Sequence, residues 1–289
     1  MANETTYTTF DDASIAAGVA NEHILSALHD LNYVDQLTRF VDLSGVPSKS
    51  HKIAMFPRLN AASVSEGVDL QATQVSSSGA TVTASEKGIM IVPTDALTLS
   101  SLINDADFAM EAAMAIAEKQ MSDVANLATG FANSVSNTGV NMTEANYLAG
   151  IALLRNARQN GPLAALLYPE LWFDYIASVG STFNIANGPG SSGSVAEGNM
   201  FSGPNFGAQG THFGVSVFTS TAVPTANAGA DSAGMIVNPR RAIARGVKYN
   251  SRTEFDRDIS ARANEIVVTS FDGVVEIEDV AGVGMIFDR

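Results

Sequence analysis

The sequence predicts a protein of the α+β class, with one long helix and mostly antiparallel strand hairpins. The first observation is a segment over residues 104–131 that repeats apolar residues at helical spacing. The second is a set of short apolar or alternating segments, bounded by Gly, Pro, Asn and Asp, that are typical of strands. The third is the C-terminal part, residues 265–287, in which such segments follow one another closely. No internal repeat is present.

Composition sets limits on function. The chain has 289 residues, 46% of them hydrophobic, which is enough to bury a sizeable core. Its net charge is −14, and the nearest approach to a basic cluster is Arg240, Arg241 and Arg245, which argues against tight binding of nucleic acid. The absence of cysteine excludes disulfides and thiolate zinc sites. No segment has the length of a membrane span or the pattern of a signal peptide, so we expect folding in a reducing cytoplasm.

The N-terminal 57 residues predict one helix and one strand. Asp11 or Asp12 can cap a helix in which Ile15, Val19, Leu25 and Leu28 recur at helical spacing. Residues 32–50 contain turn formers and Pro47, and they predict an extended connection. Residues 52–57 predict a strand.

Residues 58–86 predict a long exposed arm of two strands joined by a loop. The segment is rich in Ser, Ala, Thr and Gly, and has too few large apolar residues to form a core. These are Leu59, Val64, Val68, Leu70, Val75 and Val82. Loops of this length inside a compact domain are usually functional or disordered. We therefore expect residues 61–84 to be dispensable for the core of the subunit.

Asn104 begins the longest predicted helix, and Gly130 ends it. Its apolar stripe is Met110, Met114, Ala117, Met121, Val124 and Ala128. Asp105, Asp107 and Glu111 lie in the first turns, where acidic groups complement the helix dipole. About 26 residues would give a rod of roughly 40 Å. Core packing explains the stripe best, and a free coiled coil is the alternative.

Residues 142–182 predict a helix, a strand and a second helix. Thr143 caps a helix with Leu148, Ile151 and Leu154 on one side, stopped by Gly161-Pro162. Residues 163–168 predict a strand. Pro169 then begins a short helix that reaches Ile176.

The remaining residues predict loops and strands. Residues 184–210 hold eight glycines and predict a loop, followed by a strand from His212 to Ser220. Asn238-Pro239 predicts the start of a short helix. Strands are predicted over 265–269 and 274–277, joined by a turn at Asp272-Gly273, and a last strand covers 283–287.

A search for catalytic, cofactor and metal sites yields no candidate residues. Residues 188–193 match the dinucleotide fingerprint Gly-x-Gly-x-x-Gly in letters only, because no strand precedes them and no helix follows. The histidines, His23, His29, His51 and His212, form no metal-binding pair. We therefore predict no catalytic residue, no cofactor and no metal, and no enzymatic activity.

Glu254, Asp256 and Asp258 alternate and would share one face of a strand. Paired carboxylates can act as acid and base, but Arg252, Arg257 and Arg262 are interspersed among them. An ion-pair surface, exposed to solvent or between subunits, explains this pattern better.

The order of these elements resembles the Hong Kong 97-type coat fold of tailed phages. Residues 1–50 resemble the N-terminal arm of that fold. Residues 51–92 resemble its extended two-stranded loop, and residues 93–141 its peripheral domain with the spine helix. Residues 142–235 resemble its axial domain, where 214–224 are similar to a coat-protein strand that leads to a Pro. Residues 236–289 resemble the segment that returns to the peripheral domain.

The resemblance implies a major capsid protein that self-assembles into hexamers and pentamers of an icosahedral phage head around double-stranded DNA. We expect the DNA to be enclosed without tight binding, and the shell to form in the host cytoplasm as part of the virion. The resemblance also implies a portal and a possible decoration protein. Because no long charged helical prefix precedes the loop, we expect a separate scaffolding protein or a prefix already removed.

One departure concerns covalent cross-linking. Some relatives join subunits through a Lys on the extended loop, whereas residues 58–86 contain no Lys and Lys87 lies at the base of the loop. The alternatives are an encapsulin-like nanocompartment shell with the same fold, a flagellin-like filament subunit, and an enzyme of unknown class. The C-terminal strands argue against the filament.

Overall fold

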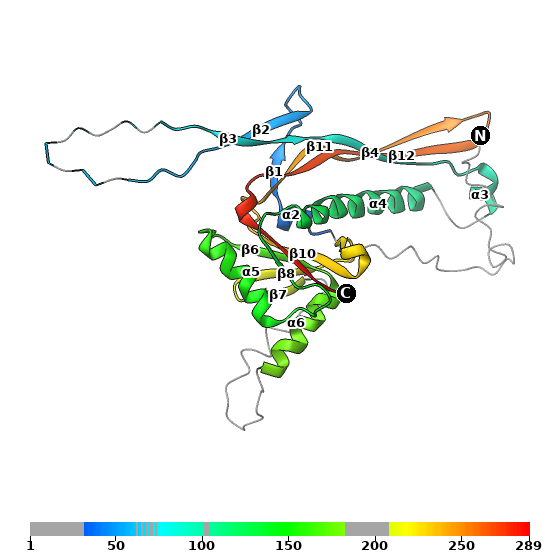
Figure 1. Ribbon diagram of the computed structural model, residues 1–289. Coiled ribbons are helices and arrows are strands. Elements are labelled where there is room, and N and C mark those ends of the chain that lie inside the picture. The colour runs from blue at the N-terminus through cyan, green and yellow to red at the C-terminus, as the bar shows by residue number, and fades with distance from the viewer. Residues whose placement is uncertain are drawn as a thin grey trace, which may run out of the picture.

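The computed structural model describes residues 32–61, 63–64, 66–67, 69, 72, 74–100, 105–182 and 208–289. The expected helix over 15–28, His23, His29, Val68, Leu70 and the glycine-rich residues 188–193 lie outside this part. In the described residues, strands form three sheets of four, seven and two strands, and helices pack on the two larger ones. The α+β class is confirmed. Figure 1 shows an elongated upper body, from which a loop extends to one side, and a second body below it.

The upper body is a four-stranded sheet with a long helix on one face. Its strand order is β1-β11-β12-β4. The strands are β1 (Arg39–Asp42), β4 (Ser85–Ile91), β11 (Ile243–Asp258) and β12 (Ala263–Glu276). The helices nearby are α2 (Val34–Leu37), α3 (Asp95–Ser100) and α4 (Asp105–Ala125). β1 pairs with β11 in parallel, and the other two pairings are antiparallel.

Helix α4 is the long helix predicted from the sequence. In its first half, the buried side chains are not the predicted ones. It has 21 residues, about 32 Å, and continues as a 3₁₀ turn, η1 (Asn126–Thr129), before Gly130. Met121 and Val124 are buried as predicted, but Met110 and Met114 are 51% and 37% exposed. Ala112 and Ile116 are buried there instead.

The lower body is a seven-stranded sheet covered on both faces. Its order is β5-β13-β10-β6-β8-β7, with β9 beside β10. The strands are β5 (Ser134–Ser136), β6 (Leu163–Leu167), β7 (Ala208–His212), β8 (Val215–Thr219), β9 (Thr225–Ala226), β10 (Asp231–Val237) and β13 (Gly282–Asp288). The helices are α5 (Glu144–Asn156) and α6 (Pro169–Thr182), with 3₁₀ turns η2 (Asn227–Gly229) and η3 (Asp279–Ala281).

The central strand β10 explains why this sheet has two cores. Met235 and Val237 pack with Met121 and Val124 of α4, whereas Ile236 belongs to the core under α5 and α6. Side chains of a strand alternate between the faces of a sheet, so one buried strand serves both cores. The predicted cap of α5 is confirmed, since the Thr143 hydroxyl accepts a hydrogen bond from the Asn146 amide.

The two-stranded sheet carries the extended loop. β2 (Ser50–Met55) pairs with β3 (Ser78–Thr83), so the predicted strand over 52–57 is confirmed with a shift of two residues. The described residues between Phe56 and Ser77 form neither helix nor strand and leave the body to one side (Figure 1). We call residues 56–77 the extended loop. The expectation that residues 61–84 are dispensable for the core is wrong for the last residues of this range, because Val82 and Ala84 are buried.

Three predicted elements are corrected: a connection, a strand and a short helix. Residues 32–50 include the helix α2 and the strand β1 rather than only extended chain. Residues 212–220 are not one strand, because Phe213 and Gly214 adopt positive φ and form the turn between β7 and β8. Pro239 begins a turn rather than a helix, and the Asn238 side chain accepts a hydrogen bond from the Arg240 amide.

The prediction of a turn at Asp272-Gly273 is also wrong, since β12 continues through these two residues. A Cβ atom on Gly273 would lie 2.0 Å from the Thr83 carbonyl oxygen, so glycine is present there because two backbones approach closely. The strand β10 was not predicted, and of β11 only the end with Glu254, Asp256 and Asp258 was predicted as a strand. β10 is buried on both faces and therefore has no alternation of polar and apolar residues.

Candidate functional site

Of the three carboxylates on β11, Glu254 forms an exposed ion pair, whereas Asp256 accepts from the Arg257 amide and Asp258 from the Ser260 amide and hydroxyl. Arg252 pairs with Glu254, and Arg257 holds both carboxylate oxygens of Asp95 at 2.5 and 2.6 Å. The hydrogen bonds with Arg257 lower the pKa of Asp95, and those with Asp95 raise the pKa of Arg257. Both groups are therefore held in their charged forms. This arrangement joins α3 to the end of β11.

The histidines that the structure describes serve packing or lie on the surface. His212 is buried, with its Nδ1 atom 2.6 Å from the Tyr175 hydroxyl and its ring edge-on to Trp172. Burial lowers the pKa of His212, partly opposed by the charge of Glu144. His51 is exposed on β2. In the described ranges, no three His, Asp or Glu side chains group as a metal site.

A buried ionic network ties the base of the extended loop to α4. The Lys87 ammonium on β4 lies 3.1 Å from Asp272 and 2.6 Å from Asp123. Asp272 is 1% exposed and Arg245 is 5% exposed. Arg245 also donates to Gln120 at 2.8 Å and to Asn250 at 2.7 Å. Lys87 is thus engaged by two carboxylates.

The charge state of this network follows from its contacts. Burial pushes the pKa of Asp123 upward, but hydrogen bonds from Lys119 and Lys87 outweigh burial and hold that pKa below its usual value. No sequence pattern indicated the network, because its members come from β4, α4, β11 and β12. Fixed charges at this junction hold the helix in one position on the sheet.

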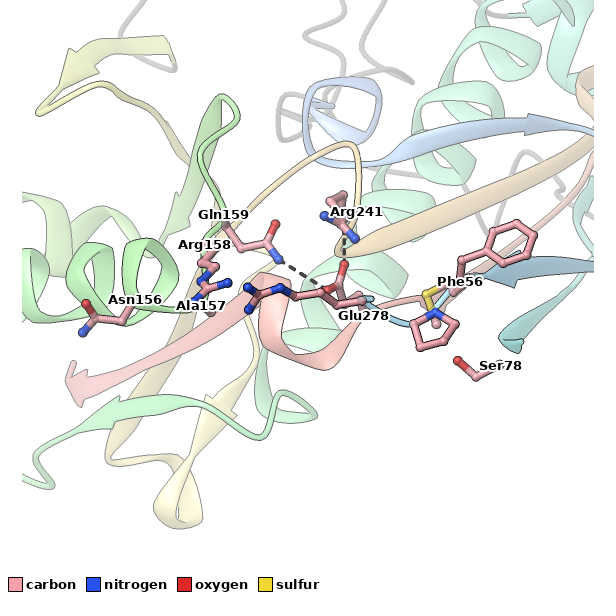
Figure 2. Close-up of a pocket in the computed structure, with 11 residues that line it drawn as sticks. Phe56, Ser78, Asn156, Ala157, Arg158, Gln159, Arg241 and Glu278 are labelled. Atoms are coloured by element: carbon pink, nitrogen blue, oxygen red, sulfur yellow. Dashed lines mark hydrogen bonds and ion pairs between the residues drawn. The ribbon is translucent and has the colours of Figure 1, made fainter. Parts of the chain in front are cut away.

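An open cleft of about 620 Å³ lies where the extended loop leaves the body. It is lined by Met55, Phe56, Pro57, Arg58, Ser78, Asn156, Ala157, Arg158, Gln159, Arg241 and Glu278. We call it the arginine cleft, because three arginines line it and only one acidic residue does. Figure 2 shows Gln159 and Arg241 both reaching Glu278, with Phe56 on the far side.

The back wall of the arginine cleft is a fixed polar chain. The buried side-chain amide of Asn238 donates to the side-chain oxygen of Gln159 at 3.0 Å. The side-chain amide of Gln159 in turn donates to the Glu278 carboxylate at 3.4 Å. Arg241 donates to the other oxygen of Glu278 at 2.8 Å. Arg155 donates to the Gln159 carbonyl oxygen at 2.9 Å, which fixes the chain after α5. The wall is therefore preorganised before anything binds.

Arg158 enters the cleft from an unusual backbone position. The Gln159 amide donates to the Leu154 carbonyl and the Arg158 amide to the Arg155 carbonyl, which is the Schellman ending of a helix. The residue at the position of Arg158 is usually glycine, because φ is positive there, and φ of Arg158 is 62°. A non-glycine residue costs about 1–2 kcal/mol in this conformation.

The extended loop exposes its own apolar groups. Phe56 is 79% exposed, and Leu59, Val64 and Val75 are also exposed. Nothing in the described part of the chain supports these side chains, because pairing between β2 and β3 ends at Met55 and Ser78. These described apolar side chains are therefore available for contact with another surface.

No described helix is both long enough and apolar enough to span a membrane. The sequence matches no protein-family model and no curated protein.

Solved structures share the whole fold at low sequence identity. The head structure of Helicobacter pylori bacteriophage KHP40 matches with a TM-score of 0.74 and 14% identity, over 96% of this chain and 98% of that chain. A structure of Mycobacterium phage Che8 matches with a TM-score of 0.72 and 15% identity, over 92% and 95%. The capsid structure of cyanophage P-SCSP1u matches with a TM-score of 0.66 and 13% identity, over 98% and 94%. The chain therefore has the coat fold found in phage heads and capsids, as its sequence predicted.

Proposed function

We propose that this protein is the major coat subunit of a tailed-phage head. The observation that carries the proposal is the length of the structural match, which covers nearly all of this chain and nearly all of the phage chains. In this role the subunits form hexamers and pentamers that close into an icosahedral shell around double-stranded DNA. The function lies in the surfaces of the protein, and it needs no catalytic centre.

The extended loop supports self-assembly on physical grounds. It projects from the body with exposed Phe56, Leu59 and Val64, and its residues have no core of their own. A neighbouring subunit would supply the missing surface. Many contacts of ordinary protein–protein size then add up to a stable shell, because each subunit is held at several sites at once.

The proposed division of the chain follows the coat fold. Residues 1–50 form the N-terminal arm, 51–92 the extended loop with its flanking strands, and 93–141 the peripheral domain. Residues 142–235 form the axial domain, and 236–289 return to the peripheral domain. The boundary between the last two parts falls inside β10 (231–237), and β13 (282–288) pairs with that strand, which supports a close connection between these parts.

The net charge of −14 supports enclosure of DNA without tight binding. Tight binding would require several Lys or Arg contacts to phosphates. A separate scaffolding protein, a portal and a possible decoration protein would complete the assembly in the host cytoplasm. The relatives named above are phage particles, which favours a phage head over an encapsulin-like shell.

Expression followed by negative-stain microscopy and sedimentation tests the proposal. The subunit should form capsomers and closed shells, alone or with its scaffolding protein. A protein that sediments only as a monomer, both with the scaffolding protein and in purified particles, would overturn the proposal. Binding of duplex DNA by the isolated subunit should be weak at physiological salt.

A further inference from the structure

We propose that the arginine cleft binds a small phosphate-bearing anion, which holds the start of the extended loop against the end of α5. This ligand site lies outside the proposed coat function, because it belongs to the single subunit and would exist with or without assembly. The class of ligand follows from the charges of the cleft, from the places of its arginines in the fold and from its apolar side.

The cleft holds more positive charge than its own residues neutralise. Arg241 is matched by Glu278, which also accepts a hydrogen bond from Gln159. Arg58 and Arg158 line the same cleft, and their side chains have no hydrogen bond or ion pair in the part of the chain that the structure describes. Two unmatched guanidinium groups in one concave site favour a ligand with at least two negative charges.

The two unmatched arginines belong to different parts of the fold. Arg58 lies in the extended loop, shortly after the last paired residue of β2, whereas Arg158 lies just after the end of α5. Like charges that share a cleft repel each other. An anion between them replaces this repulsion with two attractions, and phosphate suits the place because guanidinium groups bind its oxygens in pairs. Binding would therefore join the loop to the body.

The backbone around Arg158 also favours a ligand-binding role for this side chain. Its φ of 62° is a conformation that glycine adopts without strain. Strained positions of this kind cluster at functional sites, including those that hold ligands. The carbonyl groups of Leu153, Leu154 and Arg155 at the end of α5 would repel an anion, but all three accept hydrogen bonds from the backbone amides that follow.

The cleft has the size and the apolar side that a nucleotide requires. Its volume of about 620 Å³ is within the usual range of small-molecule sites. Phe56 is 79% exposed, and Figure 2 shows it across Glu278 from Arg158. An exposed aromatic ring is a surface on which a nucleic-acid base can stack. Phosphate is the chemistry that an inorganic anion and a nucleotide share, and Phe56 is the residue that distinguishes between them.

Titration calorimetry of the subunit with pyrophosphate and with ATP tests the site. We expect both probes to bind saturably at low salt, with one ligand per subunit. Arg158→Gly removes one guanidinium group and relieves the positive φ, so it should keep the fold and weaken both affinities about tenfold or more. Arg262, in the turn between β11 and β12, also has positive φ, so Arg262→Gly is the matched control and should bind as the wild type does.

The two probes distinguish the sources of phosphate. If ATP binds more tightly than pyrophosphate, and Phe56→Ala removes the difference, the ligand is a nucleotide. If both bind equally, the ligand is an inorganic phosphate. Either result supports the anion site.

Limited digestion with trypsin tests the link between the anion and the loop. The extended loop contains one Arg and no Lys, so cleavage after Arg58 reports on this segment alone. Pyrophosphate should slow this cleavage several-fold in the wild type and in Arg262→Gly, but not in Arg158→Gly.

Three results would overturn the anion site. The first is no binding of either probe at millimolar concentrations, and the second is binding that Arg158→Gly leaves unchanged. The third is equal affinity for duplex DNA per phosphate, because that would indicate a general basic surface. Each of these results leaves the proposed function standing, since that function fails only if the wild-type chain does not assemble.

Discussion

At the scale of single residues, two acidic side chains share a site where β12 ends. Burial, a hydrogen bond with Asp279 and the charge of Asp279 together raise the pKa of Glu276 to about 7. Asp279 also accepts a hydrogen bond from the Ala132 amide at 2.6 Å, which holds it in place. The pair therefore connects the end of β12 to the segment before β5, and the proton on Glu276 dissociates near neutral pH.

This pair predicts a dependence of stability on pH. The folded protein keeps the proton of Glu276 up to about pH 7, whereas the unfolded chain loses it near the ordinary value of 4.5. The contribution of Glu276 to stability should fall as pH rises from about 4.5 to 7, because the folded state keeps this proton there and the unfolded state does not. Glu276→Gln keeps a hydrogen-bond donor for Asp279 and removes this loss. Melting curves should show the variant close to wild type at pH 4.5 and more stable at pH 8, whereas Glu66→Gln in the exposed loop should track the wild type throughout.

Asp272 is the second residue whose removal has a defined consequence. It lies between Lys87 and Arg245, at 3.1 and 3.8 Å, with 1% of its side chain exposed. Asp272→Ala leaves two cations close together without this carboxylate. We expect a loss of roughly 3–5 kcal/mol in urea unfolding, the usual cost of breaking a buried pair.

The control for Asp272 is the exposed pair of Arg252 and Glu254. Arg252→Ala should cost less than about 1 kcal/mol, as exposed ion pairs do. Equal losses for both variants would mean that the buried network does not hold α4 on the sheet.

At the scale of elements, sequence patterns correctly predicted those features that depend only on residues close together in the chain. The N-terminal cap of α5, the proline at the start of α6 and the end of the long helix before Gly130, counting its 3₁₀ turn, all depend on neighbouring residues, and these were predicted. The face of α4 depends on the partner. Its first half packs on Ile266 and Val268, and small side chains such as Ala112 let the helix approach the sheet. Periodicity favours large residues as the buried face, so it selected Met110 and Met114 wrongly.

Strand β12 shows how a turn signal can have another cause. Asp-Gly marks hairpin turns in many sequences, but here Gly273 lies inside a strand under the Thr83 carbonyl. Gly273→Ala must therefore displace one backbone from the other, and we expect a loss of about 1–3 kcal/mol or more. Gly45→Ala, with no atom within 4 Å of the new methyl group, should change stability by less than about 0.5 kcal/mol. Chemical denaturation of both variants would test this, and equal stabilities would show that the approach of β3 to β12 is not tight.

At the scale of the whole molecule, the arginine cleft was beyond prediction for a topological reason. Its residues come from the start of the extended loop, the start of β3, the end of α5, the turn between β10 and β11 and the segment after β12. Only the fold brings these five segments together. The net charge did not indicate the cleft either, because arginines can cluster at one place on a chain whose total charge is −14. The exposed loop, in contrast, was predictable, since a long segment with few apolar residues cannot form a core anywhere.

The extended loop gives the sharpest test of the molecule as an assembly subunit. Met55 and Ser78 are paired in register, so a two-residue Asn-Gly turn can replace Phe56–Ser77 and close the hairpin between β2 and β3. This deletion keeps Val82, which packs with Ile53 in the core. Circular dichroism and thermal melting should show a folded monomer with a melting temperature near that of the wild type, because those removed side chains that the structure describes are exposed. Electron microscopy should show no stable shells. A truncated chain that unfolds would place the loop in the core of the subunit, and one that still forms normal shells would remove the loop from the contacts between subunits.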